Sequence, residues 1–567
     1  MELQRLGRVS VSFCTPGACI HLHRSYTELS TMKLSLTRLP LMMLLAASTA
    51  VACAAPTDAG EESVQGGEED LTSLTARARK LQFAGYVYVA DGTSDSDILR
   101  AVKQQTQSAF GALRTAKVGV NSRELKDVDP STFLKTPVSV VDPAHPGTAT
   151  KMTKVSYTYT DNALVPTPMA TRTAISLALL GSNYSSKIDR VLPECTANDK
   201  EAKEFTGSIW YVFDPSVSTC KPAMVAEQQK IDADRHGLTA GQIPVSEVNR
   251  LYIPMQANLK PTSQTTATKY PEYDRLYGGG VESGKLVVGM VSGMMADWAA
   301  GEHHDTFEDE GFDMWMGGLR EVFKARPGFK LVSVDPQTDV LKYKVGSTNV
   351  SFASFEDVIA FELDNRNPAG ITSSNRDALR KAVADNVVHR FITFEVPVQV
   401  TMNGSTKPVT IKLQSYFGAE TDSAPHKRLI KTSDIFVYNG HSYIGYGPLD
   451  PSRFTASDFP ATYQVMNVNG CVSYNYYEKD YIPLKQGGTK NLDLVSNGLE
   501  SWVNESGPAM GRFVGAFIDG KQNSYKAILK AAQFTYFGYD WGMDALRVVD
   551  GEVDNKYTPT RTPITVQ

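Results

Sequence analysis

Short apolar runs alternate with amphipathic helical patterns through the second half of the chain, and this alternation is the strongest constraint on its fold. Residues 285–291 are almost entirely apolar, which is typical of a buried strand. Apolar residues at helical spacing over 311–324 predict an amphipathic helix that Pro327-Gly328 ends, and residues 329–334 predict a second strand. Strands that alternate with helices favour an α/β sheet.

The same alternation continues further along the chain. A helix and four strands are expected over 375–388, 391–402, 408–416, 434–438 and 463–468. The dipeptide Asn403-Gly404 lies between the first two of these strands and predicts a hairpin turn. A loop and strand over 487–497, followed by a helix that contains Met510 and Phe517, would complete and cover the sheet.

The first half of the chain, residues 75–258, mixes both patterns and is expected to form a separate α+β domain of unknown role. Residues 95–113 predict a helix, with Ser94 or Asp95 as its cap. The aromatic, β-rich runs 155–159 and 209–213 predict strands.

A shift in composition marks the boundary between the two halves. Residues 259–281 are rich in Thr, Ser and Gly and predict a linker. The α/β domain would then occupy 282–550, and residues 551–567 would form a C-terminal tail.

The N-terminus carries an export signal. Residues 32–53 contain a positive segment, a short apolar run and small residues that end at Cys53, as in a bacterial lipoprotein signal peptide. We therefore expect residues 1–31 to precede the true start, Cys53 to carry a lipid that anchors the protein to a membrane, and 54–74 to be a flexible acidic tether. The protein would be an exported lipoprotein of the cell envelope, at the outer membrane. If Cys53 is incidental to an ordinary cleaved signal, it would be periplasmic or secreted.

Composition excludes several functional classes. The formal net charge of -5 provides no basic excess for binding nucleic acid. The hydrophobic fraction of 42% and the charged fraction of 21% are those of globular proteins, which excludes chain-wide disorder. The sequence has no nucleotide, haem or flavin signature, so we expect no cofactor.

The six cysteines can be assigned one by one. Two precede the expected start, and a third is Cys53. In an exported protein, Cys195 and Cys220 are expected to form a disulfide. A metal site is the alternative, although no histidine lies close to them in sequence. Cys471 is then left as an unpaired thiol.

Two stretches resemble catalytic motifs without fitting them. Gly279 to Lys285 has the glycine–lysine spacing of a phosphate loop, but Leu286 replaces the required Ser or Thr and a strand follows. Ser292 lies in G-x-x-S-G rather than G-x-S-x-G, which makes it a poor candidate nucleophile.

A dense polar cluster follows the first predicted strand, and it consists of Glu302, His303, His304 and Asp305 with the acidic residues 308–310. Open α/β sheets build their sites at the carboxyl ends of strands, so these side chains are candidates for contacting substrate. Zinc or calcium binding is an alternative, but the H-E-x-x-H spacing is absent, and we assign no metal. A charged surface loop is the third interpretation.

A stronger pair of residues follows the strands at 434–438 and 463–468. His441 comes shortly after the first strand and Cys471 after the second. If these strands are parallel neighbours, both residues lie at the same sheet edge, where an imidazole can activate a thiol as a nucleophile. Gly440 and Gly470 suit sharp turns with amides available to an oxyanion.

The alternative is that Cys471 is a buried free cysteine and His441 a histidine of the core. Tyr474 likewise either lines a substrate cleft or packs in the core.

A strand that leads into a histidine, followed by a strand that leads into a cysteine, resembles the caspase–gingipain–legumain clan of cysteine peptidases. The resemblance covers roughly residues 285–520. It implies a caspase-like, mostly parallel sheet flanked by helices and a polypeptide substrate. It also implies that Cys471 is the nucleophile, that His441 is its proton-transfer partner, and that the amides of Ser442 and Cys471 form the oxyanion hole.

The chain departs from the clan at Ser442, where the clan usually has glycine, and around Cys471, where the flanking residues are not those of caspases. Three hypotheses follow: a cysteine hydrolase, most simply a peptidase; a catalytically inactive module that binds a protein or cell-surface ligand; and a structural envelope lipoprotein.

Overall fold

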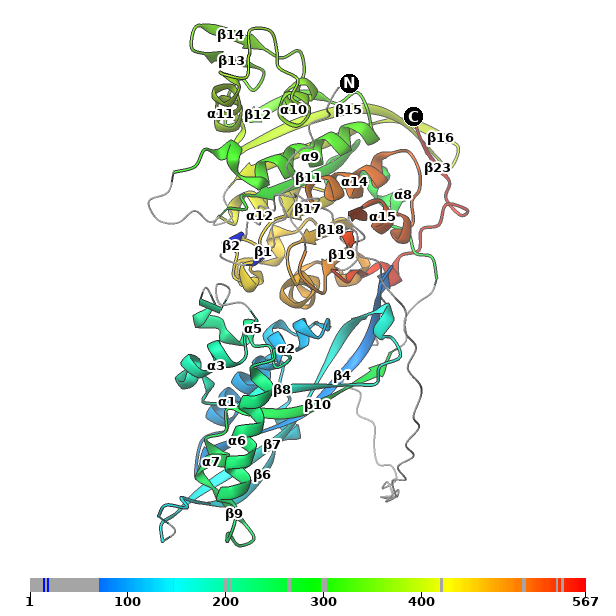
Figure 1. Ribbon diagram of the computed structural model, residues 1–567. Coiled ribbons are helices and arrows are strands. Elements are labelled where there is room, and N and C mark those ends of the chain that lie inside the picture. The colour runs from blue at the N-terminus through cyan, green and yellow to red at the C-terminus, as the bar shows by residue number, and fades with distance from the viewer. Residues whose placement is uncertain are drawn as a thin grey trace, which may run out of the picture.

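The computed structural model describes residues 71–567 apart from 146, 198–201, 204, 263–266, 297–302, 419–421, 502–505, 537–538 and 542–544, together with the short strands β1 (Cys14–Thr15) and β2 (Ala18–Cys19). Two large mixed sheets flanked by helices make up the fold (Figure 1). The expected α/β architecture is confirmed at this level. The expected signal peptide with Cys53, and most of the expected tether, lie outside the described residues.

The larger sheet comes mainly from the second half of the chain. Its strands, in spatial order, are β12 (Lys330–Asp335), β15 (Arg390–Met402), β16 (Ser405–Gly418), β11 (Lys285–Gly293), β17 (Ile435–Asn439), β18 (Gln464–Asn469), β19 (Leu492–Asn497), β22 (Arg547–Asp550) and β3 (Thr72–Ser73), with β23 (Ile564–Val566) beside β15. The neighbours from β16 to β19 are parallel, and the outer pairs are antiparallel. The predicted strands and the hairpin at Asn403-Gly404 are confirmed.

Helices accompany this sheet: α8 (Tyr273–Gly279), α9 (Glu310–Ala325), α10 (Phe355–Asp364), α11 (Arg376–Val387), α12 (Ala424–Thr432), α13 (Lys479–Tyr481), α14 (Ser506–Ile518) and α15 (Tyr525–Ala531). Successive side chains of the buried strand β17 point to opposite faces of the sheet. Ile435 and Val437 pack in the cluster that contains α9 and α14, whereas Phe436 and Tyr438 belong to the cluster that contains Leu429 of α12. The central strands are apolar throughout because both of their faces are covered.

Two small hairpins lie outside the two large sheets. They are β13 (Lys342–Val345) with β14 (Thr348–Ser351), and β20 (Phe534–Tyr536) with β21 (Tyr539–Trp541).

The smaller sheet belongs to the first half. Its strands run in the order β8 (Ala174–Leu180), β10 (Tyr252–Pro261), β4 (Ala76–Ala90), β7 (Ala149–Pro166), β6 (Leu134–Val141) and β9 (Gln242–Pro244), with β5 (Gly119–Val120) beside β7. Its helices are α1 (Asp95–Gln107), α2 (Ala109–Thr115), α3 (Ile188–Glu194), α5 (Ile209–Val212), α6 (Cys220–Asp234) and α7 (Val245–Val248). The predicted helix over 95–113 is confirmed as α1 and α2, and Ser94 caps α1.

The strand predicted at 209–213 is wrong, because these residues form the short helix α5. All of them are buried, and an apolar run this short has the same pattern in a buried strand and in a buried helix. The expected disulfide between Cys195 and Cys220 is present, with a Cα–Cα separation of 4.6 Å.

Three segments expected at the domain boundaries contribute to the core. The end of the expected tether includes β3, which pairs with β22. The expected linker includes the end of β10 and helix α8, whose Tyr273 and Leu276 are buried. The expected tail includes β23. None of the described helices is long and apolar enough to cross a membrane.

The two halves share a continuous hydrophobic core. One cluster includes Phe110 and Tyr211 of the first half together with Tyr438 and Tyr476 of the second. The rings of Phe110 and Tyr476 stack with centroids 6.3 Å apart. Figure 1 shows α2 and α5 of the first half on the side of the smaller sheet that faces the larger sheet.

A buried acid in β19 predicts how stability depends on pH. Asp493 accepts hydrogen bonds from Tyr463, Tyr525 and Asn555, and burial nevertheless raises its pKa to about 7. The folded protein therefore keeps a proton on this group between pH 4 and 7 that the unfolded chain has lost. Over that interval the stabilising contribution of Asp493 falls as the pH rises.

We expect Asp493→Asn to remove this dependence. The free energy of unfolding of the wild type, relative to that of the variant, should fall by up to about 4 kcal/mol between pH 4 and 7, at about 1.4 kcal/mol per pH unit. Urea unfolding at several pH values measures it. The exposed Asp189→Asn is the control, and parallel pH profiles for wild type and Asp493→Asn would contradict the prediction.

Candidate functional site

His441 and Cys471 lie at one edge of the larger sheet. Strands β17 and β18 are parallel neighbours, with Asn439 opposite Asn469 at their last paired position. Each strand is followed by glycine and then by the candidate residue. The N–H of Gly440 donates to the carbonyl oxygen of Asn469 at 3.4 Å, so the two turns begin side by side. The predicted placement of both residues at one sheet edge is confirmed.

A row of buried asparagines holds the strand ends together. Asn469 donates to Asn439 at 2.8 Å and accepts from Asn497, the last residue of β19, at 3.0 Å. The guanidinium of Arg547 on β22 donates to Asn469 at 2.8 Å and to Asn497 at 3.0 Å. All four side chains are buried, so these bonds fix the relative heights of four strands. In the sequence, the only trace of this row is the repeated Asn-Gly at 439, 469 and 497, one at the end of each of the three parallel strands.

The turns themselves are tight. A Cβ atom on Gly470 would lie 3.2 Å from the carbonyl oxygen of Gly440 and 3.4 Å from the Cβ of Ser442, so the absent side chain lets the turns pack. Val472 follows with a positive φ of 52°, which is unusual for a β-branched residue. Backbone in this region costs free energy and persists where the surroundings enforce it.

The imidazole of His441 is held by the segment that follows β11. Its Nε2 atom lies 3.0 Å from the carbonyl oxygen of Met295, and the side chain is buried. If Nε2 donates to this carbonyl, Nδ1 is the nitrogen that accepts a proton. Asp309 accepts from the backbone N–H groups of Met295 and Ala296 at 2.9 and 3.0 Å, and so fixes the loop that holds the imidazole. Burial raises the pKa of Asp309, although these N–H groups and nearby His441 oppose the shift.

The thiol of Cys471 is buried beneath residues of both halves. Its Sγ atom lies 3.9 Å from the carbonyl oxygen of Ser501. Burial and the carboxylate of Glu500 raise the pKa of Cys471 to about 11, while Arg114 opposes this shift. The thiol is therefore protonated at neutral pH in this conformation.

Arg114 and Glu500 form an ion pair beside this thiol. Arg114 belongs to α2 of the first half and also stacks on the ring of Tyr211, 4.4 Å from the ring centroid. Burial alone would raise the pKa of Glu500, but Arg114 outweighs burial and keeps this pKa below its usual range. The first half thus supplies a charge to the surroundings of Cys471. Sequence reasoning missed this, since no local pattern links residues so far apart in the chain.

The remaining candidates are placed as follows. Tyr474 lies in a π-helical turn (Tyr474–Glu478) and packs with Leu71 and Leu164, which makes it a core residue. Ser442 is buried, and its carbonyl oxygen accepts from the hydroxyl of Tyr477 at 3.0 Å. The role of its amide and that of Cys471 in an oxyanion hole stays a prediction.

The polar cluster at 302–310 is largely a helix start. Glu302 lies outside the described residues, and the side chain of His303 is 90% exposed. His304 is partly buried, and Asp305 forms a capping box with Glu308 as well as an ion pair with Lys381 at 2.7 Å. Across the described ranges, His, Cys, Asp and Glu side chains form no group of three that could hold a metal ion. Contact of this cluster with substrate stays a prediction.

Comparison with known protein families, curated proteins and solved structures finds no match to this chain.

The asparagine row predicts a large effect for one substitution. Asn469→Ala removes the partner of Asn439 and Asn497 and leaves the buried Arg547 guanidinium with one acceptor fewer. We expect a loss of about 2–4 kcal/mol in the free energy of unfolding, measured by chemical denaturation. The exposed Asn349→Ala should cost less than about 0.5 kcal/mol, and equal costs for the two variants would contradict the proposed role of the row.

The ion pair beside the thiol predicts opposite effects for its two members. Glu500→Gln should lower the pKa of Cys471 by about one unit from about 11, because it removes a nearby negative charge. Arg114→Gln should raise this pKa, because it removes a positive charge. The rate of iodoacetamide labelling at Cys471, followed against pH by mass spectrometry, gives the midpoint for each variant. The exposed Glu356→Gln is the control; if both test variants shift the midpoint in the same direction, loss of packing and not charge dominates.

Proposed function

We propose that the protein is a cysteine-dependent hydrolase of polypeptide substrates, with Cys471 as the nucleophile and His441 as its proton acceptor. The observation that supports this most directly is the parallel pairing of β17 with β18, which delivers both residues to one sheet edge. The succession of parallel strands from β16 to β19, with the histidine after β17 and the cysteine after β18, also supports a caspase-like fold for this half.

The proposed reaction follows a fixed order of proton transfers. His441 takes the thiol proton as Sγ attacks the scissile carbonyl carbon, and the amides at 442 and 471 stabilise the negative charge on oxygen. The imidazolium then gives the proton to the leaving amine, and water hydrolyses the acyl-enzyme. The carbonyl of Met295 accepts from Nε2 throughout and keeps the imidazole oriented. Because the thiol pKa is raised, this scheme uses proton transfer at the moment of attack and not a standing thiolate.

One observation favours a second candidate. The thiol of Cys471 is buried and protonated beside the Arg114–Glu500 ion pair. A protonated thiol is a poor nucleophile, as expected of an inactive module of the same fold. Such a module would bind a polypeptide without cleaving it.

Export is part of the proposal. The Cys195–Cys220 disulfide supports an oxidising compartment, as does the signal pattern that ends at Cys53. A lipid on Cys53 would anchor the protein to the membrane surface of the cell envelope.

The proposed hydrolase activity predicts that substitution of either Cys471 or His441 abolishes most of the turnover. Cys471→Ala and His441→Ala should each reduce cleavage of a fluorogenic peptide library by about 100-fold or more, because nucleophile and proton acceptor act in the same step. The exposed His236→Ala, which lies outside the candidate site, should retain the wild-type rate. Turnover that survives Cys471→Ala would refute the assignment. Binding of library peptides without any turnover by the wild type would instead establish the inactive module.

A further inference from the structure

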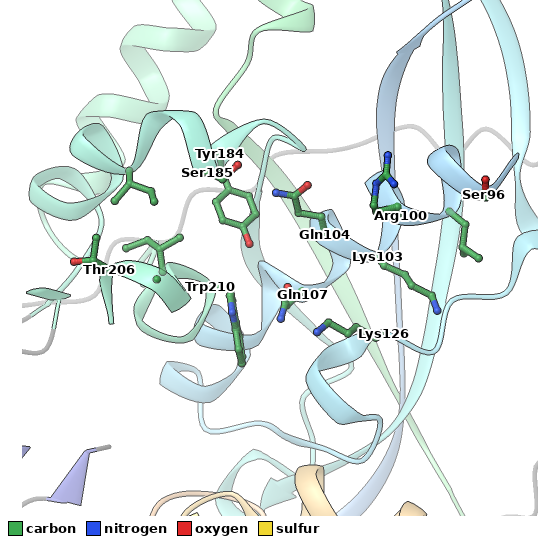
Figure 2. A pocket seen from close by; sticks show the side chains of 14 residues that line it. Ser96, Arg100, Lys103, Gln104, Gln107, Lys126, Tyr184, Ser185, Thr206 and Trp210 are labelled. Carbon is green, nitrogen blue, oxygen red and sulfur yellow. The ribbon is translucent and has the colours of Figure 1, made fainter. Parts of the chain in front are cut away.

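A pocket lies in the first half of the chain, on elements separate from the Cys471 turn. It has a volume of about 590 Å³ and is lined by side chains from α1, from the turn at Tyr184 (Tyr184–Lys187), from α5 and by Lys126. Figure 2 shows Tyr184, Gln104 and Gln107 projecting into the space between Trp210 and Lys103. Small-molecule sites in proteins have volumes in this range.

The pocket is lined by positively charged side chains, which differ in whether they already have an acidic partner. No acidic residue lines it, while Arg100, Lys103 and Lys126 do. Arg100 forms an ion pair with Asp97 at 2.6 Å, and Lys126 forms one with Glu124, which does not line the pocket. Lys103 has no acidic partner within 4.0 Å among the described residues. Its ammonium group is therefore the charge that is available to an anion.

The rest of the lining is aromatic and hydrogen-bonding. Trp210 and Tyr184 line the pocket with part of their rings, and the rest of each side chain is buried. Burial and the nearby carboxylate of Glu124 raise the pKa of Tyr184 to about 12, so its hydroxyl stays a neutral donor. Gln104 and Ser185 add groups that both donate and accept, which is the character of sugar hydroxyls.

We propose that this pocket binds a small carbohydrate that carries a negative charge, as a carboxylate or a phosphate. The anionic group contacts Lys103, a face of the sugar ring lies against Trp210 or Tyr184, and the hydroxyls bond to Gln104 and Ser185. An apolar ligand would leave these polar groups without partners, and a cationic one would be repelled by Lys103. The inference does not depend on the hydrolase, since no group of the Cys471 site takes part.

Calorimetric titration of the full chain tests the proposal. The probes are galacturonic acid and glucose 6-phosphate, with galactose and glucose as the neutral counterparts. We expect one or both charged probes to bind at least 10-fold more tightly than their counterparts, with an affinity that weakens as salt is added. Lys103→Gln should weaken this binding about 10-fold, and Lys103→Arg should retain most of it. Trp210→Phe should weaken binding of the whole ring.

Two controls separate the pocket from general charge and from misfolding. Lys221→Gln removes the same charge from an exposed position on α6 and should leave binding unchanged. Circular dichroism verifies that each variant is folded. Equal affinities for charged and neutral sugars, no binding of any probe, or equal losses in Lys103→Gln and Lys221→Gln would overturn the proposal. The carboxylate and phosphate arms identify which charged group the pocket prefers.

Discussion

The candidate site depends on the bonds between Asn439, Asn469, Asn497 and Arg547. Hydrogen bonds along a parallel sheet align strands along their length, but they do not by themselves fix the side chains beyond the last pair. Here the last residue of each of three parallel strands is a buried asparagine, and the guanidinium on the neighbouring antiparallel strand joins two of them. Because these groups are buried, leaving any of them unpaired is costly, so the turns that carry His441 and Cys471 have one relative position.

The two halves meet over the same region, and polar bonds set their alignment within an apolar core. Asn475, in the segment after Cys471, donates to the carbonyl oxygens of Val120 and Ser122 at 3.1 and 2.6 Å. Glu478 accepts from Asn121 at 3.1 Å and from Ser496 at 2.7 Å, and so joins the first half to β19. Directional bonds of this kind select one arrangement where apolar contact alone would permit several. The surroundings of Cys471 are therefore composite, and the first half is part of them.

Much of the second half was predictable, because strands with two buried faces are apolar throughout and the helices between them have strong periodicity. The neighbouring positions of His441 and Cys471 followed from two such strands and the length of chain between them. The helix at 209–212 was not predictable, since a run of four or five apolar residues carries no period. The roles of Arg114, Glu500 and Asp309 could not be predicted either, because they arise from contacts between elements distant in sequence. The repeated Asn-Gly indicates tight turns through its glycines, but no local pattern indicates that its asparagines join the strands.

The burial that orders the site also determines its chemistry. Packing from both halves excludes water from Cys471, and without water the thiolate loses its solvation, which is why the pKa of the thiol rises. The neighbouring carboxylate of Glu500 raises this pKa further, and Arg114 of the first half opposes only part of that effect. A nucleophile in such surroundings forms only if a base takes the proton at the same moment, so the position of the imidazole matters more than the intrinsic acidity of the thiol. That position is set by the carbonyl of Met295 and, behind it, by Asp309, which links the start of α9 to the end of β11. Helix α9, the strand ends of the sheet and α2 of the first half thus together determine the position of His441 and the surroundings of Cys471.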